Sequence, residues 1–273
     1  MSKSVLLRAA DVRAIVQLVA ACRELGDDAT SWRAQLVAGL ADLVGAELGS
    51  AGEMGGCESP APRDLGVTHW MAAGLADPAV IEATAAELRR DPAWAPVILQ
   101  YLSRSGEPDA ACLSRRDLLP DRDWYDTRDY QLVQRPCGLD HILWCFLALP
   151  GPATGDRSGI ILCRAAGRRD FSARDRAIVL EAHAALAPLV GGPLARYSEP
   201  SPLGLPPRTR KVLACLLEGD GDKQVAARLG MSPFTVNEHT KAIYRHFGVR
   251  GRAELLARWV RRGWGGRFAW SEG

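Results

Sequence analysis

The sequence of 273 residues contains no apolar run approaching the roughly 20 residues that a membrane-spanning helix requires. Its N-terminus also lacks the apolar core and the cleavage pattern of a secretory signal peptide. These two absences predict a cytoplasmic protein without a membrane partner.

Cys-x-x-Cys pairs are absent, although the chain contains seven cysteines. The odd number and the expected reducing compartment argue against a disulfide framework. Cys145 and Cys163 lie within apolar runs, so we expect both to be small core residues. Cys137 and His141 are four residues apart, but no further ligand stands at a useful spacing. We therefore expect no metal site and no cofactor.

A Gly-rich phosphate loop is also missing, which excludes an ATP-driven mechanism. A phosphorylated receiver domain would need an acidic pair after its first strand, whereas Asp27 and Asp28 follow a predicted helix. His69, His141 and His183 lie in no nucleophile elbow, metal-binding motif or acid/base motif. The sequence thus predicts a protein that is not an enzyme, and a degenerate enzyme-like domain remains an alternative for the N-terminal part.

Charge is distributed unevenly along the chain. Residues 201–273 contain 13 Lys or Arg and 6 Asp or Glu, a net charge of +7, whereas residues 1–200 contain 21 and 26, a net charge of −5. Gly and Pro cluster between the two parts, at residues 191–193 and 198–202. We predict an N-terminal domain over residues 1–195, a linker over 196–204 and a basic domain over 205–265 that binds a polyanion.

The basic part has the pattern of four short helices with a helix-turn-helix at its centre, over residues 221–244. Gly230 stands where the chain must leave a helix through a left-handed turn. Ser232 provides an N-cap hydroxyl, and Pro233 occupies the first position of the next helix. One small core is predicted from the apolar spacing of Val225, Leu229, Met231, Val236 and Ile243.

These residues resemble the DNA-binding domain of LuxR-type (GerE-like) transcription regulators. The matching positions are Arg208, Val212-Leu213, Lys223, Val225-Ala226, Leu229, Ser232, Thr235-Val236, His239, Ile243-Tyr244, Gly248-Val249 and Arg252-Ala253-Glu254. Thr209 departs from the Glu usual in the family, and Asn237 departs from a frequent Lys. The resemblance implies a tetrahelical domain whose third helix enters the major groove of double-stranded DNA.

The outward residues of the third helix are the candidate DNA contacts. We predict that Asn237 and Glu238 face base edges. The remaining candidates are expected to anchor phosphates and orient the helix; they are Lys223, Thr235, His239, Lys241 and Arg245.

The last helix carries an apolar side formed by Leu255, Leu256, Trp259 and Val260. This side either pairs two copies of the chain across a palindromic site or closes the core of its own domain. A homodimer is the expected assembly, with RNA polymerase as a further candidate partner.

The N-terminal part has the pattern of an α+β domain. Helices are predicted over Ala9–Leu25 and Ser31–Val44, over Asp77–Tyr101 with interruptions at its prolines, and after a cap at Ser172 with Asp175. Strands are predicted over Ala46–Ala51, Gly66–Met71, Ala110–Leu113, His141–Leu149 and Gly159–Arg164. This order, an antiparallel sheet with flanking helices followed by an all-α tetrahelical domain, resembles GAF-type sensors fused to LuxR-type readers.

Aromatic residues of the N-terminal part are candidates to line a small-molecule pocket. They are Trp70, Trp124, Tyr125, Tyr130 and Trp144. The alternative is that they pack the core, in which case a partner rather than a ligand regulates the protein. The Trp, Tyr and Asp spacing of an autoinducer-binding domain is not found, so an acyl-homoserine lactone is not predicted.

Overall fold

The computed structural model describes residues 7–57, 63–75, 83, 96–104, 111–151, 155–264 and 268–271. The chain forms two compact units, and each is described by itself. The first comprises Met1–Val19 and Arg33–Pro188, and the second comprises Ala20–Trp32 and Leu189–Gly273. The second unit therefore includes the connection between the first two helices, which the sequence had assigned to the N-terminal domain.

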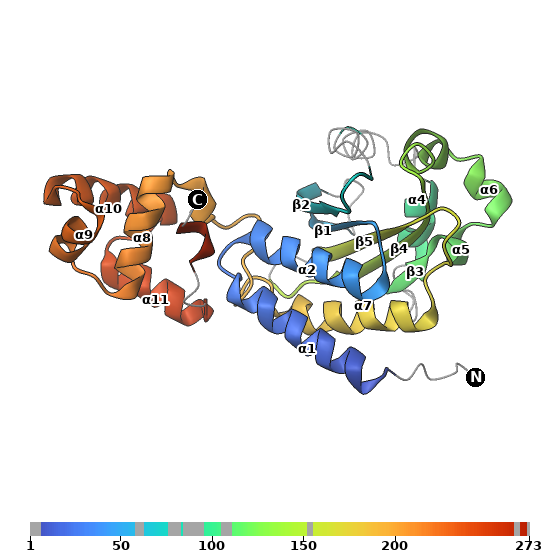
Figure 1. Ribbon diagram of the computed structural model, residues 1–273, viewed down its shortest axis with the longest axis horizontal. Helices are drawn as coiled ribbons and strands as arrows, with labels where there is room; N and C mark the ends of the chain where they lie inside the picture. The colour runs from blue at the N-terminus through green and yellow to red at the C-terminus, as the bar shows by residue number, and fades with distance from the viewer. Residues whose placement is uncertain are drawn as a thin grey trace. The chain divides into compact units, whose positions relative to one another are not determined.

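The first unit is built on an antiparallel sheet of five strands in the order β2-β1-β5-β4-β3 (Figure 1). The strands are β1 (Leu48–Gly55), β2 (Arg63–Met71), β3 (Cys112–Ser114), β4 (Leu139–Ala148) and β5 (Arg157–Ala165). β4 and β5, which correspond to the last two predicted strands, pair antiparallel with Cys145 opposite Ile160. The predicted α+β class is confirmed.

Helices α2 (Ala29–Val44) and α7 (Ala173–Leu186) cover one face of this sheet (Figure 1). α2 approaches β1 closely because Gly49 has no side chain: a Cβ there would lie 2.3 Å from a methyl carbon of Val37. α1 (Ala9–Glu24) packs on α2, with Leu18 against Gly39. The predicted capping box at Ser172 and Asp175 is present at the start of α7.

The other face of the sheet belongs to a second apolar cluster. Side chains of Leu48 and Trp144 from the strands join Tyr101, Trp124 and Tyr130 in it. The last three come from α4 (Pro96–Arg104), α6 (Asp121–Tyr125) and the π-helix η2 (Tyr130–Gln134), while α5 (Arg115–Leu118) follows β3. α4 begins at Pro96, one of the prolines at which the sequence predicts an interruption; most of the helix predicted over Asp77–Tyr101 lies outside the described residues.

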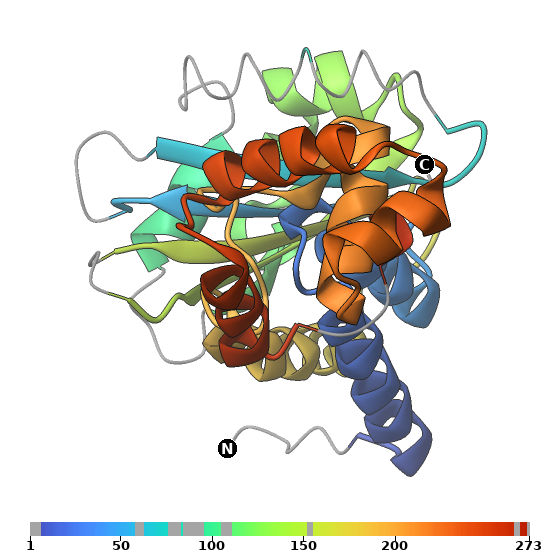
Figure 2. The same ribbon diagram turned by 90° about the vertical axis from the view of Figure 1, so that its left-hand side faces the viewer.

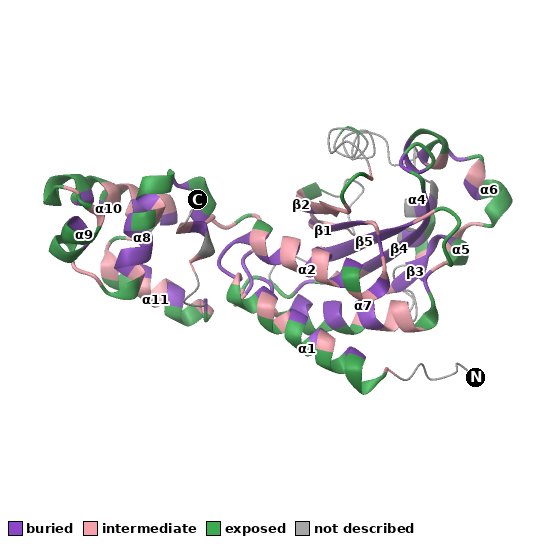
Figure 3. Cartoon of the chain, viewed as in Figure 1, coloured by how far each residue is buried: buried purple, intermediate pink, exposed green. Residues whose placement is uncertain are grey.

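The second unit contains α8 (Pro207–Glu218), α9 (Asp222–Leu229), α10 (Pro233–Phe247) and α11 (Arg252–Arg262) (Figure 1 and Figure 2). The described residues of this part of the chain also form the 3-10 turns η3 (Ala187–Leu189), η4 (Pro202–Gly204) and η5 (Ala269–Ser271). η3 begins in the first unit. The helices bury one core that includes Val212, Val225, Val236, Ile243 and Leu255, and Figure 3 shows buried residues along α8.

Two tryptophans whose roles the sequence did not indicate close this core. Trp264 and Trp270 are both buried in it. The indole nitrogen of Trp270 donates a hydrogen bond of 2.8 Å to the carboxylate of Asp27, in the connection between α1 and α2. In the same unit the indole of Trp32 donates to the carbonyl of Ala195. The core of the second unit is thus assembled from sequence segments that lie far apart.

Among the helices of the described residues, none is both long and apolar enough to cross a membrane.

Candidate nucleic-acid interface

The turn between α9 and α10 has the glycine, the cap and the proline in the roles that the sequence predicts. Gly230 ends α9 in the left-handed region at φ 62°. Ser232 caps α10, because its hydroxyl oxygen accepts the backbone N–H of Thr235 at 3.0 Å. Pro233 occupies the first turn, where its missing N–H leaves no hydrogen bond unmade. The left-handed turn at Gly230, the cap at Ser232 and the proline at position 233 therefore together set where α10 begins.

α10 divides into a buried side and an exposed side. Val236, Thr240, Ile243 and Phe247 are buried at intervals of three and four residues and pack against the neighbouring helices. The opposite side presents Asn237, Glu238, Lys241 and Arg245 to solvent. These four are the candidate DNA contacts on that side, and their spacing places them in one continuous stripe along the helix.

Phe234 belongs to the same stripe and was not among the predicted contacts. Its side chain is 74% exposed, in the first turn of α10. Apolar periodicity could not identify it, because the residue is apolar but does not fall on the buried side of the helix. The signal was its position, three residues before Asn237.

Two charged residues of the stripe are paired with each other. The ammonium group of Lys241 lies 2.8 Å from a carboxylate oxygen of Glu238. This contact lowers the pKa of the Glu238 carboxyl. Both side chains are more than half exposed, so the pair is held weakly and either partner is available to DNA.

Two predicted contacts use their polar atoms within the protein. The Thr235 hydroxyl lies 2.8 Å from the Ser232 hydroxyl, within the helix cap. The Nδ1 atom of His239 lies 3.0 Å from the hydroxyl oxygen of Thr209, a buried residue of α8. The Thr that departs from the family pattern at position 209 therefore holds His239 and, with it, the orientation of α10 against α8.

Basic residues flank the stripe to different extents. Lys223 is exposed in the first turn of α9. Arg228, on the same helix, forms ion pairs with Glu218 and Asp220, and these contacts raise its pKa. Lys223 therefore contributes free positive charge, whereas the charge of Arg228 is largely balanced.

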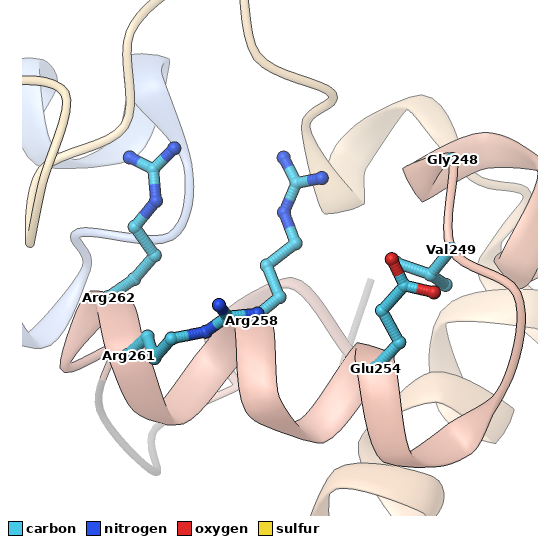
Figure 4. Close-up of a pocket in the computed structure, with 6 residues that line it drawn as sticks. All are labelled: Gly248, Val249, Glu254, Arg258, Arg261 and Arg262. Carbon is cyan, nitrogen blue, oxygen red and sulfur yellow. The ribbon is translucent and has the colours of Figure 1, made fainter.

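A shallow hollow of about 440 Å³ lies where α10 ends and α11 runs past it (Figure 4). It is lined by Gly248, Val249, Glu254, Arg258, Arg261 and Arg262. Arg258 donates to the carbonyl of Phe247 at 2.9 Å, and Arg262 pairs with Glu199. The arginines therefore close the domain as well as adding positive charge to it.

The apolar residues of α11 divide between core and surface. Leu255 and Trp259 are buried, and the Trp259 ring packs edge-on against Phe247 with 5.2 Å between centroids. Leu256 is half-buried, whereas Val260 is 78% exposed. Of the four dimerisation candidates, two close the core of their own domain and two remain at the surface.

The aromatic pocket candidates of the first unit do not share one side of the sheet. Trp124, Tyr125, Tyr130 and Trp144 belong to the same apolar cluster. Trp70 lies opposite Gly49 in the β1–β2 ladder, and it therefore points to the other face from Met71, which joins that cluster.

A polar group that the sequence analysis missed holds part of this cluster. The Asp140 carboxylate accepts hydrogen bonds from the indole of Trp124 and the hydroxyl of Tyr125, both at 3.0 Å. The buried guanidinium of Arg115 donates to the same carboxylate at 3.0 Å and pairs with Asp121. The clue in the sequence was an acidic residue directly before the apolar run that is predicted as a strand over His141–Leu149.

The three histidines of the first unit have separate partners. His183 is buried in α7, with its nitrogens 2.9 Å from the Ser158 hydroxyl and 3.3 Å from the Cys145 sulfur. Burial lowers the pKa of His183 to about 3, so the ring is neutral at pH 7. His69 contacts Ser50, and His141 contacts the carbonyl of Arg168. His183 is therefore a satisfied core residue.

Across the residues that the structure describes, no three His, Cys, Asp or Glu side chains are grouped so that they could hold a metal ion.

Comparison with solved structures finds distant similarity. SdiA of Escherichia coli is 16% identical, with 92% of this chain and 97% of that chain covered and a TM-score of 0.42. The ligand-binding domain of VqsR from Pseudomonas aeruginosa is 16% identical, with 66% and 92% covered and a TM-score of 0.40. No curated protein matches the chain. TM-scores of 0.42 and 0.40 at 16% identity do not assign this chain to a family or a function.

The family assignment rests on a match to residues 204–259, which fit the model described as "Bacterial regulatory proteins, luxR family". The matched segment contains α8, α9 and α10, the larger part of α11, and the stripe of exposed residues on α10. A family of regulatory proteins agrees with the expectation that this chain is not an enzyme. Residues 204–259 are a DNA-binding helix-turn-helix domain of the luxR family of bacterial regulatory proteins.

Proposed function

We propose that this chain is a sequence-specific DNA-binding regulator of transcription that acts in the cytoplasm as a homodimer. The observation that carries the proposal is the stripe of exposed residues on α10. The helix begins at the Ser232 cap that follows the turn after α9, and residues 201–273 have a net charge of +7. A helix with a polar, hydrogen-bonding outer side is what the major groove admits.

The candidate contact residues of α9 and α10 have different roles in this proposal. Asn237 and Glu238 face base edges, while Lys223, Lys241 and Arg245 contact phosphates and set the register of the helix. Thr235 and His239 act mainly by fixing the start and the tilt of α10, since their side chains bond to Ser232 and Thr209.

Dimerisation is proposed to use the exposed part of α11. Val260 and the half-buried Leu256 form its accessible apolar surface, while Leu255 and Trp259 support that surface from the core. A two-fold contact there presents two α10 helices to the halves of a palindromic site.

The N-terminal domain is proposed to be a GAF-like sensor over residues 1–195, joined by a linker over 196–204 to a reader over 205–265. Its candidate ligand is a small molecule that contacts the aromatic cluster around Trp124, Tyr125, Tyr130 and Trp144, with Trp70 on the opposite face of the sheet. RNA polymerase is a further candidate partner of the reader.

A second candidate is regulation by a protein partner, with no small-molecule ligand. The contacts of Asp140 favour it, because they already satisfy the polar groups of Trp124 and Tyr125. Native mass spectrometry of the purified protein separates the two: a stoichiometric bound molecule supports the sensor, and its consistent absence supports the partner.

The test of DNA binding is a selection from genomic fragments with the full-length protein at one fixed salt concentration. Enrichment of one palindromic site is expected. Asn237→Ala should then relax the preference at one base position in each half-site, whereas Lys241→Ala should weaken binding to all sequences alike. Identical, uniform losses from the two variants would show that Asn237 does not read a base.

A further inference from the structure

We propose that Phe234 determines part of the sequence specificity by packing against the C5-methyl group of a thymine in the major groove. The inference rests on the proposed function and adds an apolar reader at the N-terminal end of the stripe on α10.

The first observation is the exposure of the side chain. Phe234 is 74% exposed, whereas Val236, two residues later, is fully buried in the core of the second unit. A phenyl ring left in water forgoes the free energy that burial of its apolar surface would release. The ring is therefore available to a partner, and the fold of the domain does not require it.

The second observation is the position of the ring. Residues 234, 237, 238, 241 and 245 follow the spacing of one helix face, and each is exposed. Phe234 lies in the first turn of α10, directly after Pro233. In a helix-turn-helix the N-terminal residues of the recognition helix are those that reach base edges. Phe234 thus occupies the end of the stripe that is expected to reach base edges.

The chemistry of the ring selects its target. A phenyl group neither donates nor accepts a conventional hydrogen bond, so it has no polar base edge to read. The C5-methyl of thymine is the apolar group that the major groove displays. Asn237, one turn further along, has the amide that reads adenine, so the two neighbouring side chains read different kinds of group.

The test compares thymine with deoxyuridine, which lacks only that methyl group. The full-length protein is first used to select its site from a random duplex library. Each enriched thymine is then replaced by deoxyuridine in turn, and dissociation constants are measured by fluorescence anisotropy at one salt concentration. We expect one replacement in each half-site to weaken binding about fourfold, the effect of losing one methyl-sized apolar contact.

Phe234→Ala should bind the thymine and deoxyuridine forms of that site with equal affinity. Leu132→Ala is the matched control, because it removes another exposed apolar side chain, 55% exposed and outside the second unit; it should keep the fourfold ratio. The proposal is overturned if Phe234→Ala keeps the ratio, or if no thymine replacement affects the unaltered protein. Failure of the unaltered protein to enrich any sequence would instead overturn the proposed function.

Discussion

At the scale of single residues, the stability of the fold depends on buried charged side chains that are paired with a charge of opposite sign. Arg33 of α2 and Glu53 of β1 form an ion pair in which both side chains are fully buried. Removing two charges from water is costly, and only their mutual attraction and hydrogen bonds offset that cost. The pair therefore tolerates joint replacement better than the loss of one member.

Arg33→Ala should lower the free energy of unfolding by about 3–5 kcal/mol, because it removes a fully buried cation from its ion pair with the Glu53 carboxylate. The double variant Arg33→Met with Glu53→Leu should recover most of that loss. Urea unfolding followed by circular dichroism measures both. Arg13→Ala, at an exposed position of α1, is the control and should be close to neutral. A loss below about 1 kcal/mol in Arg33→Ala would contradict the prediction.

Asp27 makes the stability of the second unit dependent on pH. Burial, opposed by the hydrogen bond from Trp270 and aided by the nearby charge of Asp28, raises the pKa of this carboxyl to about 7. Between its ordinary pKa of 3.8 and about 7, the folded state keeps a proton that the unfolded state releases. Stability from this group therefore falls as the pH rises through that window.

Asp27→Asn removes the titration and keeps an oxygen that accepts the hydrogen bond of Trp270. The stability of the variant relative to the unaltered protein should increase from pH 4 to pH 7 and then level off. Calorimetric unfolding at a series of pH values gives this difference. A constant difference across the range would mean that Asp27 is ionised in the folded protein throughout.

At the scale of elements, the join between α9 and α10 depends on the left-handed backbone of Gly230. A Cβ at this position would meet no atom within 4 Å, so the cost of replacement comes from backbone conformation alone. Gly230→Ala should destabilise the protein by about 1 kcal/mol and Gly230→Val by more, whereas Gly230→Asn should cost less than either, since Asn tolerates this region. Thermal unfolding of the three variants gives the order, and equal losses in all three would contradict it.

The same elements show what could be predicted from the sequence. The turn at Gly230, Ser232 and Pro233 was predicted because each residue acts within its own few neighbours. The partners of Asp140 and the burial of Trp270 were not, because they depend on contacts between segments distant in the chain. The order of the strands in the sheet could not be predicted for the same reason. β1 pairs with β5, and most of the first unit lies between these two strands in the sequence.

At the scale of the whole molecule, the uneven charge predicts how binding responds to salt. Each phosphate contact that is lost should reduce the slope of log K against log salt concentration by about 0.9. We expect Lys241→Ala and Arg245→Ala each to produce such a reduction, measured by anisotropy titrations of the full-length protein with one duplex. Arg122→Ala, in the first unit with a side chain 86% exposed, should leave the slope unchanged. A similar reduction in Arg122→Ala would indicate a non-specific effect of net charge.

The hydrogen bond between Asp27 and Trp270 joins positions 243 residues apart in the chain. Residue 27 leaves the ribosome long before residue 270 is synthesised, so the core of the second unit lacks Trp270 until synthesis has passed that position. Closing so long a loop is entropically slow. During synthesis the four helices exist for a time without Trp270, and the core of the second unit is completed after that residue has emerged.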